Sequence, residues 1–301
     1  MNMKSFFAIL FFILVLFLLV FYWFVPYNSI NLGSSSNSNF TMNSSIDEDL
    51  QFYPNMRFAE KDISYQIENC PLQRKNDMEQ AFVLIENNTE LEFFPTISNP
   101  QIIVTCDEKT KIEGNLFIAG EGGPTNITVA GTFNVIESGK ILLLDNSKCE
   151  RPNVAIHELL HVLGFTHSKN PNNIMYEISE CQQTIGEDIV IFLNEIYSIP
   201  SEPDLVFENA SAFLHGKYLD VNFTLRNDGL KDSGRSVVKL YVDNKVIKEI
   251  SIPEVQIGYG RKISLANLWV PQVNIEEIKF VIENDFSELD KANNEVSLKV
   301  K

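Results

Sequence analysis

An unbroken apolar run near the N-terminus constrains the fold of this chain more than any other feature. Residues 6–25 read FFAILFFILVLFLLVFYWFV. At 1.5 Å per residue, a helix of that length matches the hydrocarbon core of a bilayer, which is about 30 Å thick. We therefore expect residues 1–27 to form an N-terminal transmembrane helix that anchors the chain.

Flanking charge predicts the orientation of this anchor. Lys4 precedes the run, and no further Lys or Arg occurs before Arg57. This asymmetry keeps the short N-terminus inside and places the bulk of the chain outside the cytoplasm, as a single-pass protein of the cell membrane. The alternative is a secreted protein released by signal cleavage. A signal peptide usually has a shorter apolar region, roughly 7–15 residues, that ends in small residues, whereas aromatic residues crowd positions 21–24 here.

Composition argues against nucleic acid as a partner and leaves the pairing of the cysteines undecided. The formal net charge is −16, which argues against nucleic acid, because binding phosphates requires clustered Lys and Arg. Six Asn-x-Ser/Thr sites give weak support for an extracellular location. An even number of cysteines outside the cytoplasm allows two disulfides in three pairings, and their spacing fits no Cys-x-x-Cys metal site. They are Cys70, Cys106, Cys149 and Cys181.

The chain divides by composition and periodicity. Residues 28–55 are rich in Ser and Asn and read as a flexible tether, and the two prolines of residues 199–204 indicate a linker. Between them, residues 56–198 mix predicted helices and strands. We expect helices at 71–91, 153–163 and from Thr184 onward, where Thr184 and Glu187 have capping-box spacing. We expect strands at 63–68, 100–106, 116–119, 127–135 and 140–144, with turns at Gly120, Gly122, Gly123, Pro124 and Gly139.

Beyond the linker the pattern changes to short alternating runs. About seven such runs between residues 205 and 301 predict an all-β, immunoglobulin-like sandwich. Asp243 and Asn244 mark a hairpin turn. We expect Trp269 in the core of this sandwich and His215 at or near its surface. Asp285, Glu288 and Asp290 lack EF-hand spacing, so we interpret them as a solvated turn rather than a calcium site.

Three of the four histidines fall in the segment HELLHVLGFTHSKNPNNIMY, residues 157–176. His157 and His161 are four residues apart and lie on one face of a helix, where both can bind a single Zn²⁺. Glu158 lies on a neighbouring flank, where it can take a proton from a zinc-bound water. Gly164 allows the chain to leave the helix, so that His167 can return as the third ligand.

Three neutral ligands leave the fourth position of a zinc ion for water. A zinc-bound water has a pKa near 7 and the ion polarises a carbonyl oxygen, which are the requirements for hydrolysing an amide. Met175, in a predicted tight turn beneath the histidines, would give the site an apolar floor without binding the metal.

This segment resembles the metzincin zinc metalloproteases, and the matrixins most closely. Ser168 after the third His and the Met175–Tyr176 pair follow the matrixin pattern, and the resemblance covers about residues 58–198. It implies an α+β domain with a twisted, mostly parallel sheet and an active-site helix. It also implies zinc on His157, His161 and His167, Glu158 as general base, and Met175 as the Met-turn residue. Peptide substrate would pair with an edge strand, which we expect within residues 127–135.

The same resemblance implies disulfides Cys70–Cys106 and Cys149–Cys181. It also marks departures. With only His215 left over, we expect no second, structural zinc site, and the tether lacks a PRCG-type cysteine switch. A structural calcium would be typical of such relatives, but no ligand set in the sequence supports one.

Residues 205–301 resemble CARDB-type adhesion domains in the stretches RNDGLKDSGRSVVKLYVDNKVI and ELDKANNEVSLKV. This implies a surface protein or glycan as ligand. We therefore predict a membrane-anchored, extracytoplasmic zinc endopeptidase acting on protein or peptide substrates. The alternative is a surface adhesion protein whose metalloprotease-like domain is not catalytic.

Overall fold

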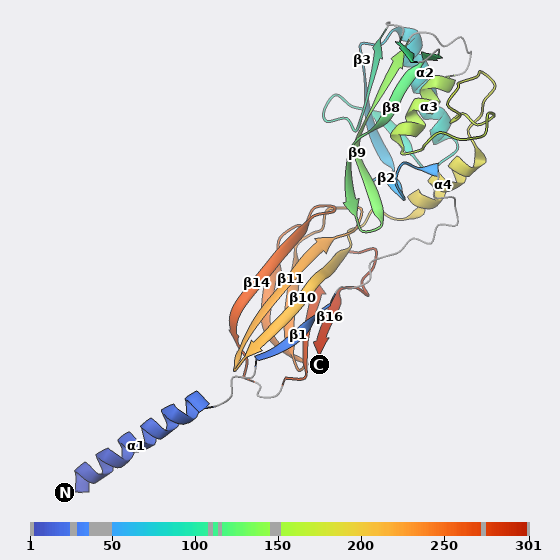
Figure 1. Cartoon of the computed structure of the whole chain (residues 1–301). Coiled ribbons are helices and arrows are strands. Elements are labelled where there is room, and N and C mark those ends of the chain that lie inside the picture. The colour runs from blue at the N-terminus through green and yellow to red at the C-terminus, as the bar shows by residue number, and fades with distance from the viewer. Residues whose placement is uncertain are drawn as a thin grey trace.

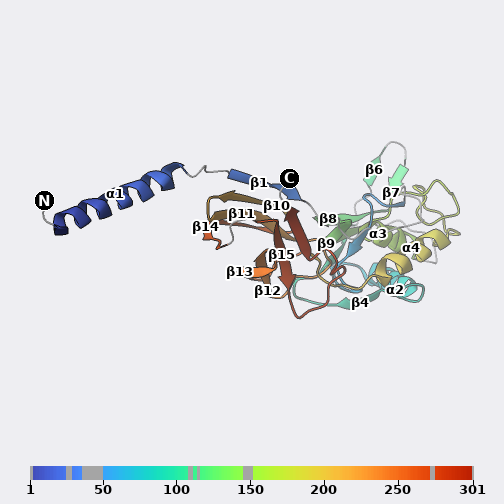
Figure 2. The same ribbon diagram turned by 90° about the horizontal axis from the view of Figure 1, so that it is seen from below.

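The computed structural model describes residues 3–24, 29–35, 50–107, 111–113, 116–144, 152–271 and 275–299. Three parts follow one another in space: an apolar helix, a β-sandwich and an α/β domain (Figures 1 and 2). The α/β domain comes before the sandwich in the sequence, yet it lies at the far end of the sandwich from the helix.

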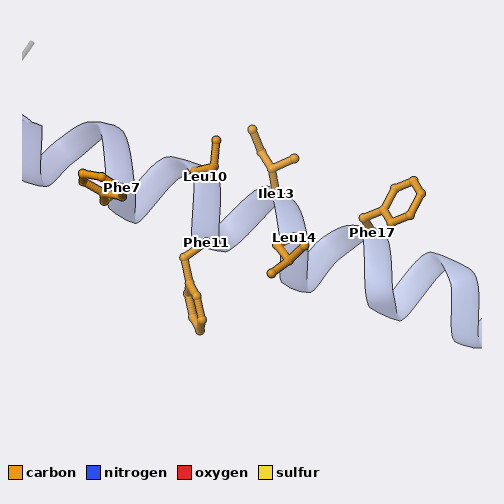
Figure 3. A pocket seen from close by; sticks show the side chains of 6 residues that line it. All are labelled: Phe7, Leu10, Phe11, Ile13, Leu14 and Phe17. Atoms are coloured by element: carbon orange, nitrogen blue, oxygen red, sulfur yellow. The ribbon is translucent and has the colours of Figure 1, made fainter.

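The apolar run forms helix α1 (Met3–Phe24). Its window Met3–Val20 has a mean hydropathy of 2.7 and none of it is buried against the rest of the chain. Large apolar side chains project from several sides of α1 (Figure 3). A helix with this length and composition meets the requirements of a membrane span, and a signal sequence meets them as well.

The sheet of the α/β domain is parallel except for one strand. Its order is β2-β9-β5-β3-β4, and β8 pairs antiparallel with β9. A separate antiparallel pair joins β6 (Lys111–Glu113) to β7 (Leu116–Ile118). The sheet strands are β2 (Met56–Phe58), β3 (Asp62–Glu68), β4 (Glu92–Pro95), β5 (Ile102–Asp107), β8 (Gly120–Ala130) and β9 (Phe133–Leu144).

Three helices complete this domain. They are α2 (Leu72–Glu86), α3 (Asn153–Val162) and α4 (Glu187–Ser198). The apolar faces predicted for α2 and α4 are buried, which confirms the helical periodicity of both segments. The capping box predicted at Thr184 is wrong, because α4 begins after Gly186 and has no side-chain cap.

The glycine-rich segment before β9 differs from expectation. Gly120, Gly122, Gly123 and Pro124 lie inside β8 and Gly139 lies inside β9, so the predicted turns are wrong. The predicted strand at 127–135 is instead the tip of the β8–β9 hairpin, with Gly131 at positive φ (55°). A Cβ on Gly139 would overlap the side chain of Val162, so close packing against α3 accounts for that glycine.

The C-terminal domain is a sandwich of two four-stranded antiparallel sheets, as predicted. One sheet has the order β1-β10-β11-β14 and the other β13-β12-β15-β16. Phe207, Phe223 and Phe280 fill the core between them. The strands are β1 (Ser29–Ser35), β10 (Leu205–His215), β11 (Tyr218–Asn227), β12 (Ser236–Val242), β13 (Lys245–Ile252), β14 (Gly260–Trp269), β15 (Glu277–Glu283) and β16 (Glu295–Lys299).

Details of the sandwich both confirm and correct the predictions. Asp243 and Asn244 both have positive φ (45° and 64°), as a two-residue hairpin turn requires. The prediction of a buried Trp269 is wrong, since this side chain is 59% exposed. Residues 29–35, within the predicted flexible tether, form β1, which pairs antiparallel with β10.

The α/β domain and the sandwich meet at an apolar cluster, and a buried guanidinium holds the linker between them to the α/β domain. Arg57 is fully buried and donates to the carbonyls of Phe58, Ala59, Ile196 and Ile199, so that β2, α4 and the linker are held by one side chain. The apolar cluster combines the tip of the β8–β9 hairpin with the sandwich and consists of Ala130, Phe133, Val135 and Leu230.

Candidate metal centre

Helix α3 carries the first two histidines on one face. Pro152 precedes the helix, where a missing N–H costs nothing, and Gly164 follows its end. His157 and His161 are 5% and 8% exposed. Their Nε2 atoms are 3.0 Å apart, as the four-residue spacing predicts.

Gly164 redirects the chain so that the third histidine reaches the same point. Its φ is +97°, and a Cβ there would lie 2.8 Å from Cβ of Met56. Both the backbone angle and the close approach therefore favour glycine. Beyond this turn, Nε2 of His167 lies 3.1 Å from Nε2 of His161.

Backbone carbonyls fix the orientation of the two buried rings. Nδ1 of His157 donates to the carbonyl oxygen of Ile174 at 2.6 Å, and Nδ1 of His161 donates to that of Phe165 at 2.8 Å. With Nδ1 as the donor, the Nε2 lone pair of each neutral ring faces the common centre.

The chemistry of this donor set fits a zinc ion. One nitrogen from each of His157, His161 and His167 lies within 4.8 Å of the others. Burial lowers the pKa of His161 to about 4, with a further contribution from His157. Burial also lowers the pKa of His157. Neutral rings with converging lone pairs would repel one another, and a cation bound at about 2.0–2.1 Å removes that repulsion.

The segment after His167 forms the predicted tight turn. Met175 is buried (1% exposed), its N–H donates to Oδ1 of Asn173, and its carbonyl accepts from the N–H of Ser168. Ile174, whose carbonyl orients His157, belongs to this turn. The turn therefore supports the first histidine through its backbone as well as filling space with Met175.

Glu158 lies between helix α3 and strand β8. It is 6% exposed, and a Cβ on Gly120 would come within 2.7 Å of its Oε1 and Cγ. Burial, with a smaller effect of Glu121, raises the pKa of Glu158 to about 8. A bound cation would oppose this shift. The carboxylate thus occupies a confined position beneath β8, next to the histidines on α3.

Strand β8 is the edge of the sheet that borders the site. It pairs only with β9 among the described strands. The edge strand was expected within residues 127–135, but the part of β8 above Glu158 is its start, at Gly120–Gly122. Glycines at these positions allow β8 to approach the backbone of helix α3. In the sequence, the same glycines are interpreted as turn residues, so the sequence does not predict this close packing.

Replacing Gly122 by Ala should disrupt the site, whereas the same change at Gly123 should not. A Cβ on Gly122 would overlap the carbonyl oxygen of Glu158, and a Cβ on Gly123 would meet nothing within 4 Å. We expect Gly122→Ala to cost about 1–3 kcal/mol of stability and, by displacing Glu158, about 100-fold in any hydrolytic rate. Thermal unfolding and casein cleavage would measure both effects. Equal behaviour of the two variants would contradict this packing.

Several contacts at the site could not be predicted from any pattern in the sequence. Phe52 stacks on His161 with ring centroids 5.8 Å apart, and its N–H donates to the carbonyl of Gly164. The carbonyls of Phe165 and Ile174 orient the rings, and a backbone carbonyl is present in every residue. Only the fold places them opposite the histidines.

The disulfide predictions are partly answered. Cys70 and Cys106 are bonded, joining the end of β3 to β5. Cys181 is also disulfide-bonded, while Cys149, its predicted partner, lies outside the described residues.

Comparison with known proteins agrees with this geometry. Residues 57–197 match the family model described as Matrixin, and residues 202–298 match that described as CARDB. A search of the curated proteins found no match. Among solved structures, one similar chain is the CARDB domain of the PF1109 protein in complex with di-metal ions from Pyrococcus furiosus. It is 19% identical and covers 33% of this chain and 87% of its own, with a TM-score of 0.28.

Proposed function

We propose that this chain, which joins a matrixin domain to a C-terminal CARDB domain, is a zinc-dependent endopeptidase that acts outside the cell membrane. The observation that carries the proposal is the convergence of the Nε2 atoms of His157, His161 and His167, with the buried carboxyl of Glu158 on the same helix as the first two. Three nitrogen ligands with a neighbouring acid–base group are what metal-assisted amide hydrolysis requires.

In this proposal, the three histidines would hold a zinc ion, which would supply Lewis-acid activation of the scissile carbonyl and of the attacking water. Glu158 would take a proton from the attacking water as the water oxygen bonds to the carbonyl carbon. When the C–N bond breaks, the same carboxyl delivers the proton to the leaving amine. Burial favours the protonated form of Glu158 and so helps it to hold the proton between the two steps.

Strand β8 would position the substrate. Its outer edge pairs with no other described strand, so its backbone N–H and C=O groups are available to an extended peptide. Because Gly120 lies directly against the carboxyl of Glu158, a peptide paired with the start of β8 would place a backbone carbonyl beside this side chain.

Anchoring at the membrane is supported by α1. Its apolar window is not buried by any other part of the described chain, and a predominantly apolar helix of this length is stable in a bilayer. The protease domain would then face the extracytoplasmic side, where disulfides persist.

The zinc requirement can be tested on the full chain in detergent with two histidine variants. Wild type should hold about one zinc per chain and cleave casein, and a chelator should abolish cleavage until zinc is restored. His167→Ala should lose zinc and activity. His215→Ala is the matched control, because His215 lies in the sandwich and should be dispensable. Intact mass of the same preparation from membranes would show whether residues 1–27 are retained.

Two results would contradict the proposal. Zinc bound equally well by His167→Ala would place the metal elsewhere. Zinc in wild type without cleavage of any unstructured protein or peptide would favour the second candidate, a surface protein that binds a protein or glycan through its CARDB domain. The exposed Tyr218 and Trp269, which lie opposite each other on β11 and β14, are the surface that favours this second candidate.

A further inference from the structure

The loop between β15 and β16 closes over the start of the sandwich. This loop, residues 284–294, carries acidic and amide side chains, and the N–H of Leu289 donates to the carbonyl of Pro203 at 3.0 Å. Asp204, the next residue, is fully buried. The expectation of a solvated turn is correct for Asp285, which is exposed, and wrong for Glu288, which is 8% exposed.

Four side-chain oxygens in this region are buried and accept no hydrogen bond. They are Oδ2 of Asp204, Oε2 of Glu288, Oδ1 of Asn284 and Oδ1 of Asn294. Buried acceptors of this kind are rare in folded proteins and carry a large desolvation cost unless a donor or a cation compensates them.

The orientation of these groups follows from the bonds that their other atoms make. Oδ1 of Asp204 accepts from Nδ2 of Asn293 at 2.9 Å, and Oε1 of Glu288 accepts from Nδ2 of Asn284. Because the amide nitrogen of Asn284 is already a donor to Glu288, turning this amide over would break that bond. The second oxygen of each carboxylate, Oδ2 of Asp204 and Oε2 of Glu288, has no hydrogen-bond partner within the described chain.

Hydrogen-bond donors, but no cationic side chain of the described chain, balance the charge of Asp204 and Glu288. Glu288 feels the charge of Asp204 and also accepts bonds from the backbone of Leu205 and the side chain of Asn294, so the four residues form one group. Within the described chain, neither carboxylate forms an ion pair with Lys, Arg or His. Burial raises the pKa of Asp204 to about 6, and burial also raises that of Glu288. Asp204 is thus mostly ionised at neutral pH despite its burial.

We propose that Asp204, Asn284, Glu288 and Asn294 bind a calcium ion at the junction of the linker and the sandwich. All four offer oxygen, the ligand of hard cations, and none of them has the imidazole nitrogen or thiolate sulfur that favours zinc. Calcium accepts mixed carboxylate and amide oxygens in irregular geometry, whereas magnesium demands a regular octahedron.

A cation here would have a structural effect on the whole junction. Asp204 ends the linker, and its carbonyl accepts from the N–H of Asp228 at 2.7 Å. The same linker is held to the α/β domain by Arg57 through Ile199. Calcium would therefore join the β15–β16 loop to the segment that connects the two domains.

The test uses the full chain in detergent, stripped of metal on a chelating resin and reloaded with one equivalent of zinc. Equilibrium dialysis against calcium should give one bound ion per chain beyond the zinc, and millimolar calcium should raise the Tm of the sandwich by about 5 °C or more. Asp204→Asn and Glu288→Gln should each weaken calcium binding at least about 10-fold. Asp285→Asn, an exposed carboxylate of the same loop, is the matched control and should bind as wild type does.

Comparing the stability of wild type and variants in the absence of calcium distinguishes a cation site from a polar cluster that is stable without a cation. If the site is built for calcium, removing one buried charge should leave calcium-free stability unchanged or higher, and only the gain from calcium should be lost. Absence of calcium binding by wild type at 10 mM (about 10- to 100-fold above the dissociation constants of extracellular calcium-binding modules) would overturn the inference. So would undiminished binding by the double variant Asp204→Asn/Glu288→Gln. Neither result would affect the zinc content or casein cleavage that test the proposed peptidase.

Discussion

Glu158→Gln should abolish casein cleavage while leaving zinc bound. The amide has nearly the same shape as the carboxyl, so the packing beneath Gly120 is retained, but it cannot take a proton from water. General acid–base catalysis contributes typically 10²–10⁴-fold, and we expect a rate loss of at least about 1000-fold. Cleavage should be measured on preparations with equal zinc content and equal Tm, because both quantities report whether the three histidines remain in place.

Glu121→Gln provides the matched control for this experiment. Glu121 is the carboxylate whose charge contributes to the raised pKa of Glu158, and it is exposed on β8. Its replacement changes the local charge without removing the proton acceptor, so we expect a change of only a few fold. A fully active Glu158→Gln variant would disprove the role of Glu158 as general base. A similar loss in both variants would point to charge rather than position.

Arg57→Ala should be among the most destabilising substitutions in the chain. The guanidinium is fully buried and donates to four backbone carbonyls, from β2, α4 and the linker, and it lies 4.4 Å from the ring centroid of Tyr197. Alanine would leave these carbonyls without donors in a space too small to hydrate fully. Each buried unsatisfied group costs about 1–3 kcal/mol, so we expect a total loss of at least about 3 kcal/mol.

Urea unfolding followed by circular dichroism would measure this loss, with Arg235→Ala as the control for removal of an exposed arginine. Arg57→Lys adds a second comparison, because lysine keeps the charge but lacks the planar group that reaches several carbonyls at once. If Arg57→Ala unfolded at the same urea concentration as Arg235→Ala, the junction would be held by the apolar cluster alone.

The sequence predicts the metal-binding side chains of the site better than it predicts the backbone groups that orient them. The helix with His157 and His161, the exit at Gly164 and the return of His167 follow from spacing and side-chain type, and the structure has all of them. The groups that orient the rings could not be predicted in this way, because they are carbonyls of Phe165 and Ile174. Their role depends on where the chain passes, which side-chain patterns do not encode.

The glycines also show what sequence patterns do not encode. Gly120, Gly122 and Gly139 read as turns because glycine most often permits unusual backbone angles. In the structure they lie in strands, and what each requires is room for an adjacent helix. At Gly131 and Gly164 the backbone angle is indeed positive. Sequence alone does not separate these two uses of glycine.

The pairing of β1 with β10 has a consequence for release of the proposed peptidase from its proposed membrane anchor. β1 follows α1 directly, yet its partner strand belongs to the C-terminal domain, with Ser29 opposite His215 and Ser35 opposite Ala210. A proteolytic cut within residues 36–49 would break the covalent path from α1 to the α/β domain, but the backbone hydrogen bonds between β1 and β10 would persist. Shedding would then require two events, cleavage and strand dissociation, and a nicked enzyme could stay at its original position as a two-chain complex.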